Sequence, residues 1–372
     1  MRAGWLVGWV VWAAGCSGAT SPGGDCPDCD AGEVSLDADQ GTDAAGSDGG
    51  PLDAGARDTG ARDTGARDTG ARDTGARDTG ARDTGARDAG ALDAGGVVGP
   101  PGDPATRDVA AVCARWGLDR DLWGTLPGWV ADADRCANGT LPEITRTAGV
   151  RLTNAFRWLA GLAPTTENAA ALPNAQACAV MMNANGQLSH RPPTTWACYS
   201  SAGAQGAATS NIGGGRGFGM TPSYAVSSWI DDSRDLTMTL GHRRWMLFEP
   251  LTTVAYGQAG GFACLVVLSG HNGARTRPWV AWPNAGPTPM QAMTRIWSFS
   301  AAGLGLSSST RVGVTLDGAP VMVEAQLRAA NYGDPTVSWD MPAIRPGGVY
   351  AVTVTGLRGA DVRYTVRPVA CD

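Results

Sequence analysis

Three histidines are the side chains of this chain best suited to acid–base chemistry or metal binding near neutral pH: His190, His242 and His271. Taken alone, a histidine in a folded domain is more often a surface residue or a hydrogen-bonded structural residue than a ligand. The sequence Gly-His-Asn-Gly around His271 favours an exposed turn. The chain has neither a Gly-x-Ser-x-Gly nor a His-Glu-x-x-His motif, so no known nucleophile or zinc motif is indicated.

Nine cysteines indicate an exported chain that folds in an oxidising compartment. Six of them lie in the part of the chain that has the composition of a folded domain: Cys113, Cys136, Cys178, Cys198, Cys264 and Cys371. An even number is what three disulfides require, although spacing alone does not select among the pairings. We expect the pairing that closes short loops, which links Cys113 to Cys136 and Cys178 to Cys198 and leaves Cys264 with Cys371.

Residues 1–16 are typical of an export signal. Arg2 supplies a positive charge, and the apolar stretch that follows it is too short to span a bilayer. The sequence Ala-Ala-Gly-Cys that ends at Cys16 resembles a bacterial lipobox, which implies acylation of Cys16 and anchoring to a membrane by an N-terminal lipid. Ser17 resembles a signal for outer-membrane sorting. We therefore expect an exported protein of the cell envelope, either an outer-membrane lipoprotein or a secreted protein.

Residues 17–100 are expected to form a disordered tether, because they contain almost no large apolar side chains to offset the entropy of ordering. From Pro51 to Gly95 a five-residue unit repeats, mostly Ala-Arg-Asp-Thr-Gly, and this period fits neither a helix nor a strand. Cys26 and Cys29 have thioredoxin-like spacing, but no strand precedes them, so a local disulfide is favoured.

The charge composition argues against nucleic-acid binding. The chain has no lysine, and its 29 basic residues stand against 35 acidic ones, which gives a formal net charge of −6. No basic patch is evident in the sequence.

Apolar periodicity predicts the helices that position the histidines. One helix ends near Gly161, since four apolar residues before it recur at intervals of three and four. Those residues are Leu152, Ala155, Phe156 and Leu159. A second helix is predicted across 176–183, a third after the start signal Thr221-Pro222, and a short fourth one around His242.

Strand patterns follow the helices, which is the element order of an α+β fold. Residues 253–258 and 262–268 are rich in β-branched and aromatic residues and predict a strand pair. Beyond residue 282 only strand patterns remain, including a hairpin signal at Asp317-Gly318. We expect an α+β domain at 101–282, with an N-terminal extension, followed by a small all-β immunoglobulin-like sandwich at 283–372. The alternative is that the later strands extend the sheet of the first domain.

Five short sequence blocks lie between residues 151 and 268. Each is too short to be specific alone, but their order and spacing together are specific. They are Asn154-Ala155-Phe156-Arg157, Leu188-Ser189-His190, Ser210-Asn211-Ile212, Trp229-Ile230-Asp231-Asp232 and Gly241-His242-Arg243-Arg244-Trp245. Together they resemble a CAP domain, the family of cysteine-rich secretory, antigen 5 and pathogenesis-related proteins, and the Gly-His-Arg block resembles its bacterial SCP-like members. The resemblance implies an α-β-α sandwich.

The resemblance also implies a cleft lined by two histidines and two acidic residues. Carried over by position, these are His190, His242 and the acid Asp232, whereas Ser210 stands where the other acid belongs. His190, His242 and Asp232 are the implied metal ligands, with zinc as the cofactor. The missing carboxylate at Ser210 argues against acid–base chemistry. Arg243 and Arg244 follow His242. We expect them to pair with surface acids, and the alternative is that they recognise an anion at the rim of the cleft.

From these features we expect a membrane-tethered CAP-domain protein that acts as an extracytoplasmic binding module for an apolar or peptide ligand. Binding is favoured over catalysis, and an enzymatic role is left open. The first alternative is a metal-dependent hydrolase of peptide or cell-envelope substrates that uses His190, His242 and Asp232. The second is a structural envelope lipoprotein.

Overall fold

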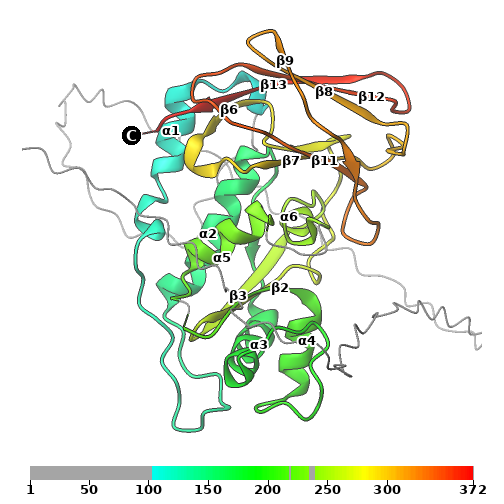
Figure 1. The fold of residues 1–372 in the computed structure, drawn as a ribbon. Helices are drawn as coiled ribbons and strands as arrows, with labels where there is room; N and C mark the ends of the chain where they lie inside the picture. The colour runs from blue at the N-terminus through cyan, green and yellow to red at the C-terminus, as the bar shows by residue number, and fades with distance from the viewer. Residues whose placement is uncertain (1–102, 218, 234–238, 372) are drawn as a thin grey trace, which may run out of the picture. The chain divides into compact units, whose positions relative to one another are not determined.

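The computed structural model describes residues 103–217, 219–233 and 239–371, all of which belong to one compact unit, Ala86–Asp372 (Figure 1). The expected signal at 1–16, the acylated Cys16 and the tether at 17–100 lie outside the described residues. None of the helices in the described part is long and apolar enough to cross a membrane.

A four-stranded sheet forms the centre of the helix-containing part, with its strands in the order β1-β3-β4-β2. Its strands are β1 (Thr166–Glu167), β2 (Ser210–Gly214), β3 (Thr253–Ala259) and β4 (Phe262–Val266). β1 runs parallel to β3, and the other neighbours are antiparallel. Nearly every residue of β3 and β4 is buried, which requires helices on both faces of the sheet.

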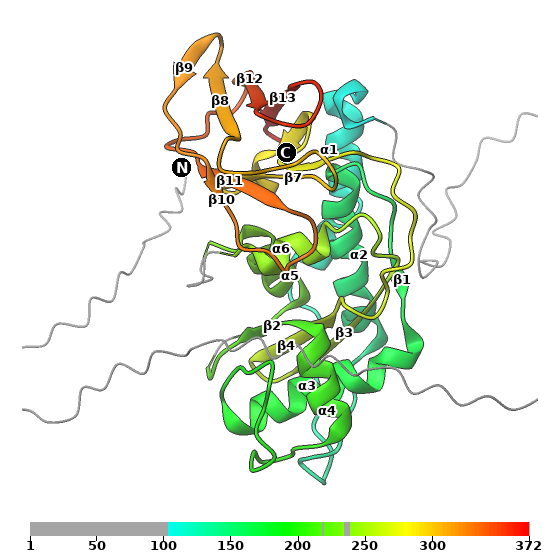
Figure 2. The ribbon, with the colours of Figure 1, turned by 90° about the vertical axis from the view of Figure 1, so that its right-hand side faces the viewer.

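Helices cover the two faces of this sheet, as Figures 1 and 2 show. One layer holds α2 (Glu143–Leu159), α5 (Pro222–Asp231) and the short α6 (Gly241–Met246), and the other holds α3 (Leu172–Asn185) and α4 (Ser201–Thr209). Side chains of β3 alternate between the layers, since Tyr256 joins the core of α2 and α5 and Ala255 joins that of α3. A Cβ at Gly257 would collide with the backbone of Ala175, so glycine allows α3 to approach the sheet closely. These layers confirm the predicted α+β fold.

Local signals set the helix ends as the sequence predicts. The hydroxyl of Thr221 accepts the backbone N–H of Tyr224 at 3.1 Å, and Pro222 occupies the first turn of α5. α2 ends at Leu159, and Gly161 follows with a φ of 75°, a conformation that favours glycine. Two further helices, α1 (Val109–Gly117) and α4, were not predicted from the sequence.

The strands after residue 279 form two sheets of their own. One has the order β10-β11-β7-β5, and the other β6-β13-β12-β8-β9. Their bounds are β5 (Val280–Trp282), β6 (Gly286–Pro289), β7 (Ile296–Ser300), β8 (Arg311–Leu316), β9 (Ala319–Val321), β10 (Gln326–Leu327), β11 (Thr336–Asp340), β12 (Tyr350–Thr355) and β13 (Val362–Val369). Side chains from both sheets share one core, with Trp297 and Trp339 from the first and Tyr350 and Val366 from the second.

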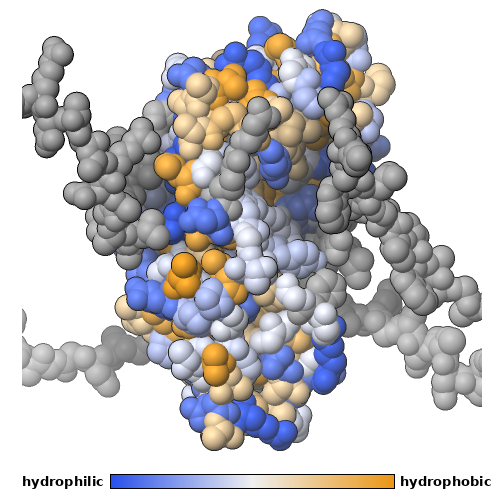
Figure 3. Space-filling model, turned by 90° about the vertical axis from the view of Figure 1, so that its left-hand side faces the viewer, coloured by the Kyte–Doolittle hydropathy of each residue, from blue (hydrophilic) through white to orange (hydrophobic). Residues whose placement is uncertain are grey.

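The predicted hairpin is confirmed, because β8 and β9 pair through a turn in which Asp317 and Gly318 have φ values of 49° and 87°. The immunoglobulin-like topology stays a prediction. On the face shown in Figure 3, hydrophobic residues lie in small groups among hydrophilic ones.

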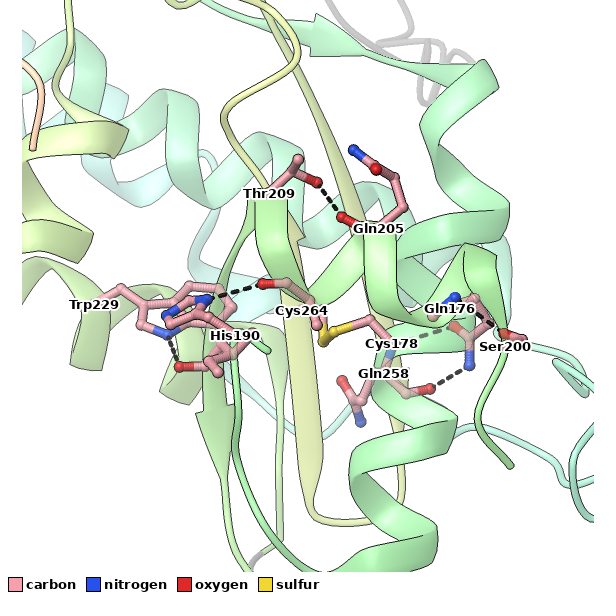
Figure 4. Close-up of a disulfide and its surroundings, with 12 residues drawn as sticks. Gln176, Cys178, His190, Ser200, Gln205, Thr209, Trp229, Gln258 and Cys264 are labelled. Atoms are coloured by element: carbon pink, nitrogen blue, oxygen red, sulfur yellow. Dashed lines mark hydrogen bonds between the residues drawn. A yellow bond between two sulfur atoms is a disulfide. The ribbon is translucent and has the colours of Figure 1, made fainter. Parts of the chain in front are cut away.

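All six cysteines in the described part are paired as three disulfides, but the expected pairing is wrong. The bonds are Cys113–Cys371, Cys136–Cys198 and Cys178–Cys264. Packing decides the partners rather than loop length. Cys178 lies on α3 and Cys264 on β4, and these elements lie face to face (Figure 4). Cys113 lies on α1, which packs beside β6 at the edge of the second sheet, close to the end of the chain.

Candidate functional site

His190 and His242 line one cavity of about 600 Å³. His190 lies in the segment between α3 and α4, and His242 is the second residue of α6. Ser210, the first residue of β2, lines the same cavity together with Asn211. The structure therefore brings together three of the four cleft residues that the resemblance implied.

The fourth residue, Asp232, lies behind the ring of His242. Its Oδ1 is 2.7 Å from Nδ1 of His242, and its Oδ2 accepts the backbone N–H of Arg243 at 3.3 Å. Asp232 is only 3% exposed and ends α5 in a left-handed conformation, with a φ of 50°. Because an ionised carboxylate only accepts hydrogen bonds, Nδ1 carries the hydrogen, and in the neutral ring of His242 the lone pair is on Nε2.

His190 has the same tautomer for a different reason. Its Nδ1 lies 2.8 Å from the carbonyl oxygen of Ala207, so the neutral ring donates from Nδ1 and keeps its lone pair on Nε2. The hydroxyl of Ser210 is buried and makes no hydrogen bond within the described residues. Asn211 positions the other histidine, because its side-chain amide donates to the carbonyl oxygen of His242 at 3.0 Å. This contact was not anticipated from the sequence.

The donor set suits two-point binding better than a three-ligand metal site. Asp232 uses its Oδ1 on the ring of His242, so it orients this imidazole instead of adding a third donor. Within the described residues, no three His, Cys, Asp or Glu side chains gather into a metal-binding group. Zinc binding by His190, His242 and Asp232 stays a prediction.

A loop of the sheet β10-β11-β7-β5 supplies part of the cavity wall. Asn331 and Tyr332 line the cavity, and both belong to residues 328–335, which connect β10 to β11 and are called here the β10–β11 loop. The ring of Tyr332 lies against Gly241, where a Cβ would come within 2.6 Å of its Cδ1. Glycine before His242 thus makes room for Tyr332, a role that no pattern around residue 332 indicates.

Two arginines hold this loop in place. Arg244 donates to the carbonyl oxygens of Ala329 at 2.8 Å and Asp334 at 2.9 Å, and its guanidinium lies 5.7 Å from the centre of the Tyr332 ring. Arg275 binds the carboxylate of Asp334 through two hydrogen bonds of 2.5 and 2.7 Å. The wall that Tyr332 forms is therefore a fixed part of the site.

The expectation that Arg243 and Arg244 pair with surface acids is wrong. Both are buried, and Arg243 donates to the carbonyl oxygens of Ile230, Asp231 and Ile296 at 2.6, 2.7 and 2.8 Å. Burial lowers the pKa of Arg243 to about 10, although the charges of Asp232 and Asp231 raise it. The guanidinium joins α5 and α6 to β7, which explains why an arginine follows His242.

His271 does not reach the histidine cavity, and it is half-buried rather than exposed. Its ring stacks on Trp245 with centres 5.1 Å apart and meets the edge of Phe248 at 4.9 Å. Burial lowers the pKa of His271, while a hydrogen bond with the backbone of Val267 acts in the opposite direction. The fold therefore favours the neutral ring.

This lowered pKa predicts a loss of stability in mild acid. A group with a depressed folded-state pKa stabilises the protein above its unfolded value, near 6.5 for histidine, and the benefit is lost as pH falls through the folded value. We expect the fall in Tm between pH 7 and pH 5 to be smaller in His271→Asn than in the wild type. His190→Asn serves as the control. An equal fall in wild type and His271→Asn would contradict the assignment.

Comparison with known proteins adds one finding. Residues 150–264 match the model of the CAP family, described as the cysteine-rich secretory protein family. The match runs from α2 to β4 and includes His190, Ser210, Asp232 and His242, but it ends before the β10–β11 loop. A search of curated proteins finds no match to the chain. Three disulfides and this kind of domain are both typical of secreted proteins.

Proposed function

Because residues 150–264 form a CAP domain, we propose that this chain is an exported binding module whose ligand lies in the histidine cavity. One observation carries the proposal: a cavity of about 600 Å³ combines two imidazoles with an aromatic and apolar wall that includes Trp245, Leu268 and Tyr332. Small-molecule and peptide sites share this design, in which apolar walls supply contact area and a few polar groups fix the orientation. The ligand we propose is apolar or peptidic, with an oxygen or nitrogen that meets the histidines.

The chemistry of the cavity supports binding over hydrolysis. A serine nucleophile needs a base within hydrogen-bond reach, yet the hydroxyl of Ser210 has no partner in the described part of the chain. The one buried carboxylate next to the cavity, Asp232, is engaged with His242. The Nε2 atoms of the two neutral imidazoles are thus left to accept hydrogen bonds from a ligand. Anchoring through Cys16 belongs to the same proposal and rests on the sequence alone.

The experiment uses two fluorescent probes, a dansyl-labelled fatty acid and a fluorescein-labelled unstructured peptide, with the full chain. We expect one of them to bind, and His190→Ala/His242→Ala and Tyr332→Ala each to weaken that binding about tenfold, since each removes contacts in the cavity. Met322→Ala is the matched control, because Met322 is 87% exposed and lies outside the cavity.

Two results would count against the binding module. Equal affinity of all variants for the probe would contradict binding in the histidine cavity. Cleavage of the peptide on addition of zinc, lost in His190→Ala/His242→Ala, would favour the metal-dependent hydrolase instead.

A further inference from the structure

A second cavity, of about 730 Å³, lies on the β-sandwich and shares no lining residue with the histidine cavity. Three arginines line it, Arg277, Arg363 and Arg367, against a single carboxylate, that of Asp103. Arg363 and Arg367 lie on β13, and Arg277 lies in the segment that precedes β5. The cavity is therefore strongly positive and built from segments far apart in sequence.

Two other arginines of the β-rich region are in ion pairs, whereas these three are not. Arg295 binds Asp340 at 2.9 Å, and Arg345 pairs with Asp317. Within the described residues, the guanidiniums of Arg277, Arg363 and Arg367 make no ion pair or hydrogen bond. Unpaired cations that converge on a concave surface raise the local concentration of anions.

The strand geometry sets the spacing of the charges. Along β13, Arg363, Thr365 and Arg367 are exposed, whereas Tyr364 and Val366 point into the core. Arg363 and Arg367 therefore share one face and are separated along the strand by about 13 Å. The arrangement suits an extended chain that carries repeated anionic groups.

The charge composition of residues 103–372 is consistent with a cavity that binds anions. Residues 103–372 contain 21 arginines and 18 acidic residues, although the whole chain has a net charge of −6. The excess of acid therefore lies in residues 1–102, and the unit that carries the cavity is positive.

We propose that this cavity binds an acidic polysaccharide, whose carboxylate or sulfate groups pair with Arg277, Arg363 and Arg367. Guanidinium groups match such oxyanions through paired hydrogen bonds. A nucleic acid is a poorer fit, because single strands bind on open aromatic faces. The aromatic rings here stack on one another, with Trp279 5.4 Å from both Phe299 and Tyr364.

The test measures binding of the full chain to polygalacturonate, with neutral dextran as the ligand control. We expect polygalacturonate to bind more weakly as salt is raised, and Arg363→Ala/Arg367→Ala to lose at least tenfold in affinity. Arg311→Ala is the matched protein control, because Arg311 is an exposed arginine of the same sheet outside this cavity.

Several outcomes would overturn the proposal. One is wild-type binding to polygalacturonate no stronger than to dextran, and another is equal binding by the double variant and Arg311→Ala. Tighter binding to a single-stranded oligonucleotide would overturn the ligand class. His190→Ala/His242→Ala should bind polygalacturonate as the wild type does, so this test stands or fails apart from the histidine cavity.

Discussion

Replacing Arg243 with methionine is expected to lower the free energy of unfolding by about 3–5 kcal/mol, the range for breaking a buried charged network by removing one partner. The guanidinium donates to the carbonyl oxygens of Ile230, Asp231 and Ile296. Methionine fills much of the volume but leaves these carbonyls buried without donors. Since the same contacts join α5 and α6 to β7, the change should also loosen the attachment of the β-sandwich.

Urea unfolding at pH 7 measures this cost. Arg295→Met is the matched control, because Arg295 is exposed and its pairing with Asp340 is a surface ion pair that is worth about 0–1 kcal/mol. The two variants should therefore differ by several kcal/mol. If Arg243→Met unfolds at the same urea concentration as Arg295→Met, the buried network does not hold the two regions together.

Local pattern was enough to predict the elements whose cores are formed by their own periodic side chains. α2 places Leu152, Ala155, Phe156 and Leu159 in one core, and these are the residues whose spacing predicted the helix. Local pattern likewise predicted the strands β3 and β4 and the hairpin at Asp317. α4 was missed because its sequence, Ser-Ala-Gly-Ala-Gln-Gly-Ala-Ala-Thr, has only small apolar residues and therefore no clear stripe.

Features that depend on contacts between distant segments were not predictable. The partner of Cys178 is set by the packing of α3 on β4, which cysteine spacing does not encode. From the sequence alone, Arg243 was expected to lie at the surface next to His242. In the structure it donates to the carbonyl oxygen of Ile296 on β7, a strand far away in the sequence. Tyr332 lies 90 residues beyond His242 in the chain and has no motif of its own, yet it lines the same cavity. The four cleft residues were found only through a family resemblance.

The disulfide Cys113–Cys371 should be the most stabilising of the three, and its removal in Cys113→Ala/Cys371→Ala is expected to cost about 5 kcal/mol. It joins residues separated by 258 positions, and the chain-entropy account gives larger stabilisation for longer loops. The two disulfides that remain shorten this loop in the unfolded chain to roughly 150 residues, which is still longer than the loop of any other bond.

Urea unfolding at pH 7 compares this variant with Cys136→Ala/Cys198→Ala, whose bond spans 62 positions and whose loss should cost about 4 kcal/mol. The removed bond also fixes α1 beside β6, so its loss should free the segment around Asp103. Equal stability of wild type and Cys113→Ala/Cys371→Ala would mean that core packing alone holds the two ends of the folded unit together.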